Sequence, residues 1–209
     1  MIIDKKIKDF INELKSSTPT PGGGGVASLN SAQGVALIMM VANFTVNNDK
    51  YCEWHTLCNS VLSECQELLD ILMKGIDDDA EEFTKVIAAY GLPKESDEDK
   101  EKRSRAISEA SISAAEAPLR VMKASARALE LDLSILGKSN PNIESDLYVA
   151  ARSLQAGLLS AKYNVDANIG GIKKINPDLA EEYKIKADEL IDKCNELMGK
   201  MFIGGNCVQ

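Results

Sequence analysis

The stretch Pro19–Thr45, PTPGGGGVASLNSAQGVALIMMVANFT, decides the fold, because four consecutive glycines run into a long segment without a charged residue. Its small and aliphatic side chains predict a helix that begins near Val26 and is buried among other helices. The glycines permit positive φ and close approach to a ligand, and the start of the helix offers unpaired N–H groups. We therefore expect a loop that holds an anionic or carbonyl-bearing ligand; the alternative is a plain turn with a helix cap.

The rest of the chain also follows helical spacing, and no run shows sustained period-two alternation. Asp4 is the expected cap of the first helix, and Pro118 is expected to kink or break the fourth. The last helix should end near Gly204 and Gly205, before a mobile tail. The helices are expected at about residues 4–15, 26–46, 50–90, 97–136, 143–169 and 177–204. This pattern predicts an all-α fold, an antiparallel bundle of long helices, in a single domain spanning residues 1–209.

Composition narrows the class of protein. With 209 residues and 44% hydrophobic content, the chain is long enough to bury a sizeable core. Its net charge of -8 argues against nucleic acid or an anionic membrane as a partner. The uncharged segment 26–46 is long enough to span a bilayer, but interspersed polar residues favour a helix buried in the protein.

Five cysteines without an apolar N-terminal signal indicate a reducing cytoplasm, where thiols stay free. Cys52, His55 and Cys58 have a spacing that is found in metal sites. On a helix, however, they spread over about 120°, and no fourth ligand is near in sequence. We expect no metal site.

Helical spacing singles out one of three adjacent acidic residues, Asp77, Asp78 and Asp79. The residues within about 60° of one line along this helix are Val61, Cys65, Leu68, Leu72, Ile76, Asp79, Phe83, Val86 and Tyr90. Asp79 is therefore expected in the apolar face, and the other two on the solvated side. A carboxylate in that position must be paired, hydrogen-bonded or functional. Geometry leaves a functional group and a structural ion pair equally open.

The fifth helix carries a narrow polar stripe. The residues within about 40° of one line are Asp146, Ala150, Ser153, Gly157, Ser160, Asn164 and Asn168. Such a stripe is either a ligand-binding groove or a ladder of hydrogen bonds between helices.

Several of these segments together resemble a known family. PTPGGG at residues 19–24, followed by Val41, Ala42, Asn43 and Thr45, resembles the cyclodeaminase domain of formiminotransferase-cyclodeaminase and the related methenyltetrahydrofolate cyclohydrolases. The further matching residues are Leu92-Pro93-Lys94, Ala117-Pro118-Leu119, Asn140, Ser145-Asp146-Leu147, Asn164-Val165 and Asn168. The family pattern DxDAxxF matches Asp77, Asp79, Ala80 and Phe83. The chain departs from the family at Gly25, usually serine, and at residues 47–49, usually glycine and basic residues.

The resemblance implies a folate enzyme. It assigns Asp79 as the catalytic acid/base, and it assigns to substrate binding Thr20, Pro21, Gly22, Gly23, Gly24, Gly25, Asn43, Asn140, Asp146, Asn164 and Asn168. The implied reaction converts 5-formiminotetrahydrofolate to 5,10-methenyltetrahydrofolate and ammonia. The alternatives are hydrolysis of 5,10-methenyl- to 10-formyltetrahydrofolate and a non-catalytic helical scaffold. A homodimer is expected, with no cofactor beyond the tetrahydrofolate substrate.

Overall fold

The computed structural model describes residues 1–203, which form helices and no β-strand. The α-helices are α1 (Ile7–Leu14), α2 (Gly23–Val46), α3 (His55–Tyr90), α4 (Asp97–Ile135), α5 (Ser145–Lys173) and α6 (Pro177–Ile203), and two short 3₁₀ helices are η1 (Asp49–Trp54) and η2 (Pro141–Ile143). The predicted all-α class is confirmed.

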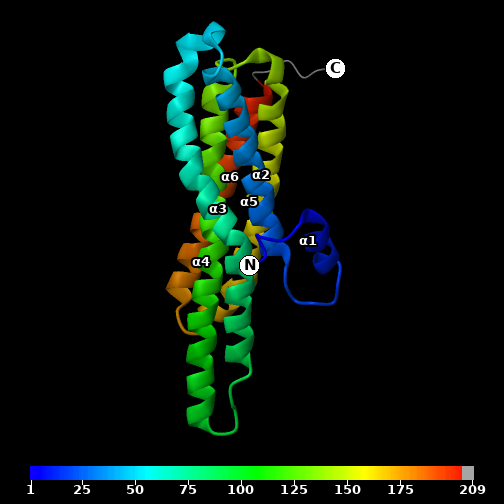
Figure 1. Ribbon diagram of the computed structural model, residues 1–209. Coiled ribbons are helices and arrows are strands. Elements are labelled where there is room, and N and C mark those ends of the chain that lie inside the picture. The colour runs from blue at the N-terminus through cyan, green and yellow to red at the C-terminus, as the bar shows by residue number, and fades with distance from the viewer. Residues whose placement is uncertain (204–209) are drawn as a thin grey trace.

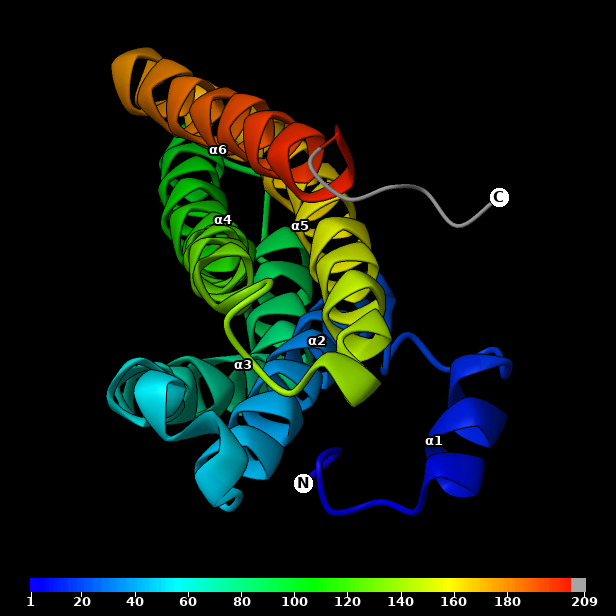
Figure 2. The ribbon, with the colours of Figure 1, turned by 90° about the horizontal axis from the view of Figure 1, so that it is seen from above.

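Long helices lie side by side along one axis, and the hairpin of α3 and α4 extends beyond the others at the lower end (Figure 1). Seen from above, α5 lies between α2 and α6, and α1 stands apart on one side (Figure 2). Helix α2 packs against α3, α4 and α5, and α5 also packs against α4 and α6. These two helices therefore build the interior, as the uncharged sequence of α2 requires.

Small residues set the crossings of α2 with its neighbours. The Ser28 hydroxyl donates to the Leu72 carbonyl at 2.8 Å, and the hydroxyls of Ser31 and Ser125 lie 2.7 Å apart. A Cβ at Gly34 would lie 2.6 Å from a carbon of Leu154 on α5. These small residues thus pack inside the protomer. Although α2 is long and apolar enough to cross a membrane, 56% of its most apolar window is buried in the bundle.

Several boundaries differ from those expected. Helix α2 begins at Gly23, so three of the four glycines are helical, and Lys6 rather than Asp4 precedes α1. A kink or a break was expected at Pro118; helix α4 runs unbroken through that residue, so it is not broken there. The expected helix end near residues 204–205 and the tail lie outside the described residues.

One buried carboxyl lies in the core away from any ion pair. Asp132 on α4 is 0% exposed, and no group in residues 1–203 donates a hydrogen bond to either oxygen. Burial raises its pKa well above the usual value. Because the folded-state pKa is raised, this group's contribution to stability is greatest below the unfolded-state pKa and falls as pH rises.

We expect Asp132→Asn to raise the melting temperature at pH 8 by about 3–6 °C, because the amide carries no charge that must be desolvated in the core, and each kcal/mol shifts Tm by about 2–4 °C. The gain should shrink at pH 5, where the wild-type carboxyl is protonated in the fold. Differential scanning calorimetry measures both, with Asp192→Asn on the exposed side of α6 as control. An equal effect at both pH values would contradict this origin.

Candidate active site

Asp79 on α3 lies against the first turn of α2. Gly22 precedes that helix in an extended conformation, and the N–H of Gly25 donates to Oδ2 of Asp79 at 3.2 Å. The first N–H groups of a helix have no partner within it, and the helix dipole places positive charge there. The start of α2 therefore holds one of the molecule's own carboxyl groups.

The absence of side chains at Gly22 and Gly24 lets the Asp79 carboxyl lie this close to the backbone of α2. A Cβ at Gly24 would lie 2.1 Å from Oδ1 of Asp79 and 2.5 Å from its Cγ, and one at Gly22 would lie 3.6 Å from Oδ2. In residues 1–203 positive φ occurs only at Gly137. The expectation that these glycines adopt positive φ in a loop is therefore wrong. Their use is to leave room for the Asp79 carboxyl against helical backbone.

The environment of Asp79 favours its neutral form. Burial raises its pKa from the usual value, and the hydrogen bond from the Gly25 N–H opposes that rise in part. No basic side chain is paired with it in the described chain. A carboxyl group whose pKa is moved toward neutrality can both accept and donate a proton near physiological pH. Within residues 1–203, Asp79 is therefore not part of a structural ion pair.

A pocket of about 230 Å³ opens beside Asp79 between α3, α4 and α5. Its lining residues are Asp79, Glu82, Phe83, Val86, Ala114, Ala117, Asn164, Ala167 and Asn168. The three alanines keep the α4 and α5 walls low, and Phe83 is 40% exposed. An exposed aromatic face opposite small side chains suits a flat ring that stacks on it.

Asn164 and Asn168 face this pocket one turn apart on α5. Nδ2 of Asn164 donates to the Ser160 carbonyl at 3.1 Å, and Nδ2 of Asn168 donates to the Asn164 carbonyl at 2.9 Å. A Cβ at Gly23 would lie 3.9 Å from Oδ1 of Asn164, which places that amide over the start of α2. The Oδ1 atoms of both amides remain as acceptors for the donors of a ligand.

Asn168 replaces a hydrogen bond that Pro118 removes from α4. Because proline has no N–H, the carbonyl of Ala114 loses its donor within the helix. Nδ2 of Asn168 donates to that carbonyl at 3.3 Å, from α5. The hydrogen bond that α4 lacks is thus replaced by its neighbour, and the helix continues.

The remaining residues assigned to substrate by resemblance divide into two places. Thr20 and Pro21 lead directly into Gly22, and Pro21 is buried. Asn43 is exposed near the end of α2, about 30 Å from Gly23 at 1.5 Å per residue.

Asn140 and Asp146 adjoin the start of α5, at the upper end of Figure 1. The N–H of Asn140 donates to Oγ1 of Thr45 near the end of α2, and its Oδ1 accepts from the N–H of Asn142. In one protomer Asn43, Asn140 and Asp146 therefore do not line the Asp79 pocket. Their assignment to folate stays a prediction.

The two aspartates beside Asp79 are not solvated, contrary to expectation. Asp78 is 9% exposed and is paired with Lys74 and with Arg120, at 3.2 Å to the latter. Asp77 accepts a hydrogen bond from the Ile2 N–H at 2.5 Å. The acidic run lies where α3 meets α4 and the N-terminal segment, so each carboxyl has a different partner. Helical angle alone did not anticipate those partners.

Glu82 was not anticipated from the sequence, although it lines the same pocket. It follows Asp79 by three residues, and positions three apart lie on the same side of a helix. That spacing is the signal that would have found it.

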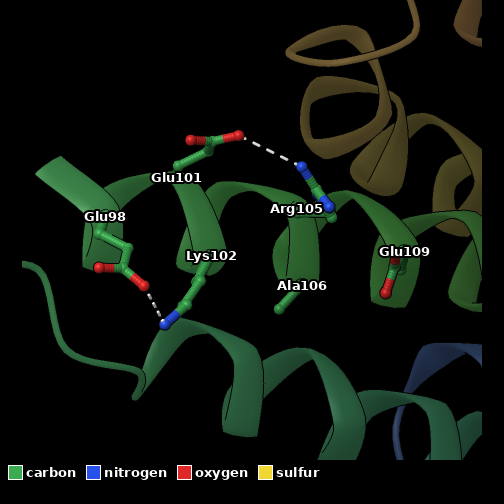
Figure 3. A pocket seen from close by; sticks show the side chains of 6 residues that line it. All are labelled: Glu98, Glu101, Lys102, Arg105, Ala106 and Glu109. Carbon is green, nitrogen blue, oxygen red and sulfur yellow. Dashed lines mark hydrogen bonds and ion pairs between the residues drawn. The ribbon is translucent and has the colours of Figure 1, made fainter.

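A second hollow, on the first turns of α4, is a surface feature (Figure 3). Its charged side chains pair with one another four residues apart, Lys102 with Glu98 at 2.6 Å and Arg105 with Glu101 at 3.2 Å. The alternating charges of this segment thus form a solvated face. In residues 1–203, no three His, Cys, Asp or Glu side chains form a metal-binding cluster.

Comparisons with known proteins identify the relatives of this chain. A family model described as formiminotransferase-cyclodeaminase matches residues 6–197. Methenyltetrahydrofolate cyclohydrolase from Methylorubrum extorquens is 40% identical over 81% of both chains. Formimidoyltransferase-cyclodeaminase from Sus scrofa is 28% identical over 92% of this chain, which spans only 37% of that relative. The crystal structure of formiminotetrahydrofolate cyclodeaminase from Thermotoga maritima superposes with a TM-score of 0.82, 26% identity and 98% coverage of each chain.

Proposed function

Because the chain belongs to the formiminotransferase-cyclodeaminase family and is a folate-processing enzyme of the cyclodeaminase or cyclohydrolase kind, we propose that it hydrolyses 5,10-methenyltetrahydrofolate to 10-formyltetrahydrofolate. The observation that carries the chemistry is the half-buried Asp79 carboxyl, held by the Gly25 N–H at the edge of a pocket that also contains Asn164 and Asn168. The 40% identity to a cyclohydrolase over most of both chains favours this reaction.

In the proposed reaction, water adds to the carbon between N5 and N10 of the cationic substrate. Asp79 accepts one proton from that water, and the bond from the carbon to N5 then breaks. N5 takes a proton, the formyl group stays on N10, and one proton is released overall. The raised pKa of Asp79 suits a group that must take up and return a proton in each turnover. No oxidation state changes, so the proposed reaction needs no redox cofactor.

The other part of the site would hold the folate. The Oδ1 atoms of Asn164 and Asn168 match the donor edge of a pterin, and Phe83 offers a face for stacking. Holding the ring there fixes the one-carbon unit relative to Asp79, which supplies the positioning that such a reaction needs.

The second candidate is the cyclodeaminase reaction, in which N10 attacks the formimino carbon and the departing nitrogen leaves as ammonia after protonation. The likeness to the Thermotoga maritima cyclodeaminase over 98% of both chains favours it. The same carboxyl would take the proton from N10 and deliver it to the leaving nitrogen.

One assay tests both reactions, because 5,10-methenyltetrahydrofolate absorbs in the near ultraviolet. Loss of absorbance from added 5,10-methenyltetrahydrofolate, beyond the uncatalysed rate, supports the cyclohydrolase. A gain from 5-formiminotetrahydrofolate with release of ammonia supports the cyclodeaminase. Absence of both changes would favour the helical scaffold.

We also propose a homodimer, supported by an exposed apolar row on α3. Phe83, Ile87 and Tyr90 follow one another at helical spacing and are 40%, 54% and 46% exposed. Exposed apolar clusters of this kind mark interaction surfaces. Light scattering at micromolar concentration should give twice the chain mass, and Ile87→Glu should lower it. A monomer mass that persists as concentration rises would rule the dimer out.

A further inference from the structure

Glu82 is a second carboxyl group in the Asp79 pocket, and it is only partly satisfied. Its Oε1 accepts a hydrogen bond from Nζ of Lys85 at 2.7 Å. Its Oε2 is buried, and no group in residues 1–203 donates a hydrogen bond to it. The Glu82 side chain is 14% exposed, whereas that of Lys85 is 58% exposed. One oxygen therefore pairs toward solvent, and the other is left without a donor.

A buried carboxylate oxygen without a donor costs free energy that a bound ligand can recover. The residues that line the pocket include two carboxyl groups, two amides and no basic side chain. This balance disfavours an anionic group in the pocket and favours a cationic group that lies beside the carboxylates.

We propose that Glu82 binds the positively charged N–C–N group of the one-carbon substrate and distinguishes it from neutral folates. This inference rests on the proposed function. 5,10-Methenyltetrahydrofolate carries a delocalised positive charge over N5, the bridging carbon and N10, and a protonated 5-formimino group is charged in the same way. Both substrates of the family's two reactions thus present a cation where Glu82 presents a carboxylate.

The product of hydrolysis, 10-formyltetrahydrofolate, is neutral at this position. The attraction to Glu82 is therefore lost when the substrate is converted, which favours release of the product. This role is separate from that of Asp79, because a fixed negative charge serves binding, whereas proton transfer needs a group that changes its charge.

The test compares the wild type with Glu82→Gln, which keeps the shape and removes the charge. Initial rates give KM and kcat for 5,10-methenyltetrahydrofolate, and competition gives Ki for 5-formyltetrahydrofolate, which is neutral at N5. We expect Glu82→Gln to raise KM for the cation about tenfold, which corresponds to about 1.4 kcal/mol, because the amide removes the electrostatic attraction between the carboxylate and the positive N–C–N group. The Ki of the neutral analogue should change by less than about twofold, and kcat should not fall.

Glu81→Gln, on the exposed neighbour, is the matched control and should leave KM and Ki unchanged. Lys85→Gln removes the partner of Oε1 and should keep or strengthen the preference for the cation. An equal loss of affinity for both ligands, or a fall in kcat with KM unchanged, would overturn the proposal. A wild-type enzyme without turnover of any folate would instead refute the proposed function itself, so the two failures are distinguishable.

Discussion

Replacement of Asp79 by asparagine is expected to lower kcat by about 100-fold or more, the range for loss of a general acid/base. Asparagine keeps the size of the side chain and still accepts the hydrogen bond from the Gly25 N–H. It does not exchange protons, so substrate affinity should change little while turnover is lost. Steady-state kinetics on the methenyl substrate measure both quantities. In the wild type, kcat/KM should rise with pH through a pKa above the usual aspartate value.

Two other aspartates on α3 provide controls of different kinds. Asp70 is exposed, so Asp70→Asn should affect neither activity nor stability. Asp78 is the structural acid, paired with Lys74 and Arg120, so Asp78→Asn should lower the melting temperature and leave kcat within a few-fold. If Asp79→Asn behaved like Asp78→Asn, with full turnover and a lower melting temperature, Asp79 would be a structural residue and the proposed chemistry would be wrong.

Gly24→Ala is expected to reduce kcat by about 10- to 100-fold with little loss of stability. The new Cβ would lie 2.1 Å from Oδ1 of Asp79, so the carboxyl must turn away and give up its bond to the Gly25 N–H. Alanine is favoured over glycine in a helix by about 1 kcal/mol, which offsets part of that loss. Kinetics and thermal unfolding monitored by circular dichroism separate the two effects.

Gly170→Ala is the matched control for that substitution, because Gly170 is also helical and nothing lies within 4 Å of its added Cβ. The double variant Gly24→Ala/Asp79→Asn should be about as slow as Asp79→Asn alone, since both changes act through one carboxyl group. Multiplied losses in the double variant, or full activity of Gly24→Ala, would show that Asp79 does not act from the position at the start of α2.

The helices could be predicted because hydrophobic periodicity and the Pro and Gly signals at their ends are local properties of the chain. A break was one of the two outcomes expected at Pro118, but α4 is continuous there. Propensity counts the hydrogen bond that proline removes, but the partner that replaces it, Asn168, is 50 residues away in sequence and near only after folding. The start of α2 was misplaced because four glycines indicate a loop unless the packing of Asp79 against them is known.

At the site, helical spacing placed Asp79 in the apolar face of one helix and Asn164 and Asn168 on the polar stripe of another. The structure brings these three residues to one pocket. The angular position of a residue around a helix does not give its distance along the helix axis. The predicted stripe on α5 therefore included Asp146, which lies about 27 Å from Asn164 at 1.5 Å per residue. Asp77 and Asp78 were placed in solvent because their partners, the N-terminal segment and Arg120, come from other parts of the chain. Each of these errors concerns tertiary neighbours that sequence spacing does not specify.

The missing N–H of Pro118 leaves the Ala114 carbonyl of α4 free to accept a hydrogen bond from another helix. In an ordinary interior turn, each carbonyl accepts from an N–H of the same helix. The free carbonyl of Ala114 accepts from the amide of Asn168, and this hydrogen bond favours one position of α5 along the axis of α4. Pro118→Ala would restore the N–H at this position, so the Ala114 carbonyl would again have a donor within α4. Pro118 thus helps to set the axial register between α4 and α5, and with it the position of the α5 amides relative to the carboxyl groups of α3.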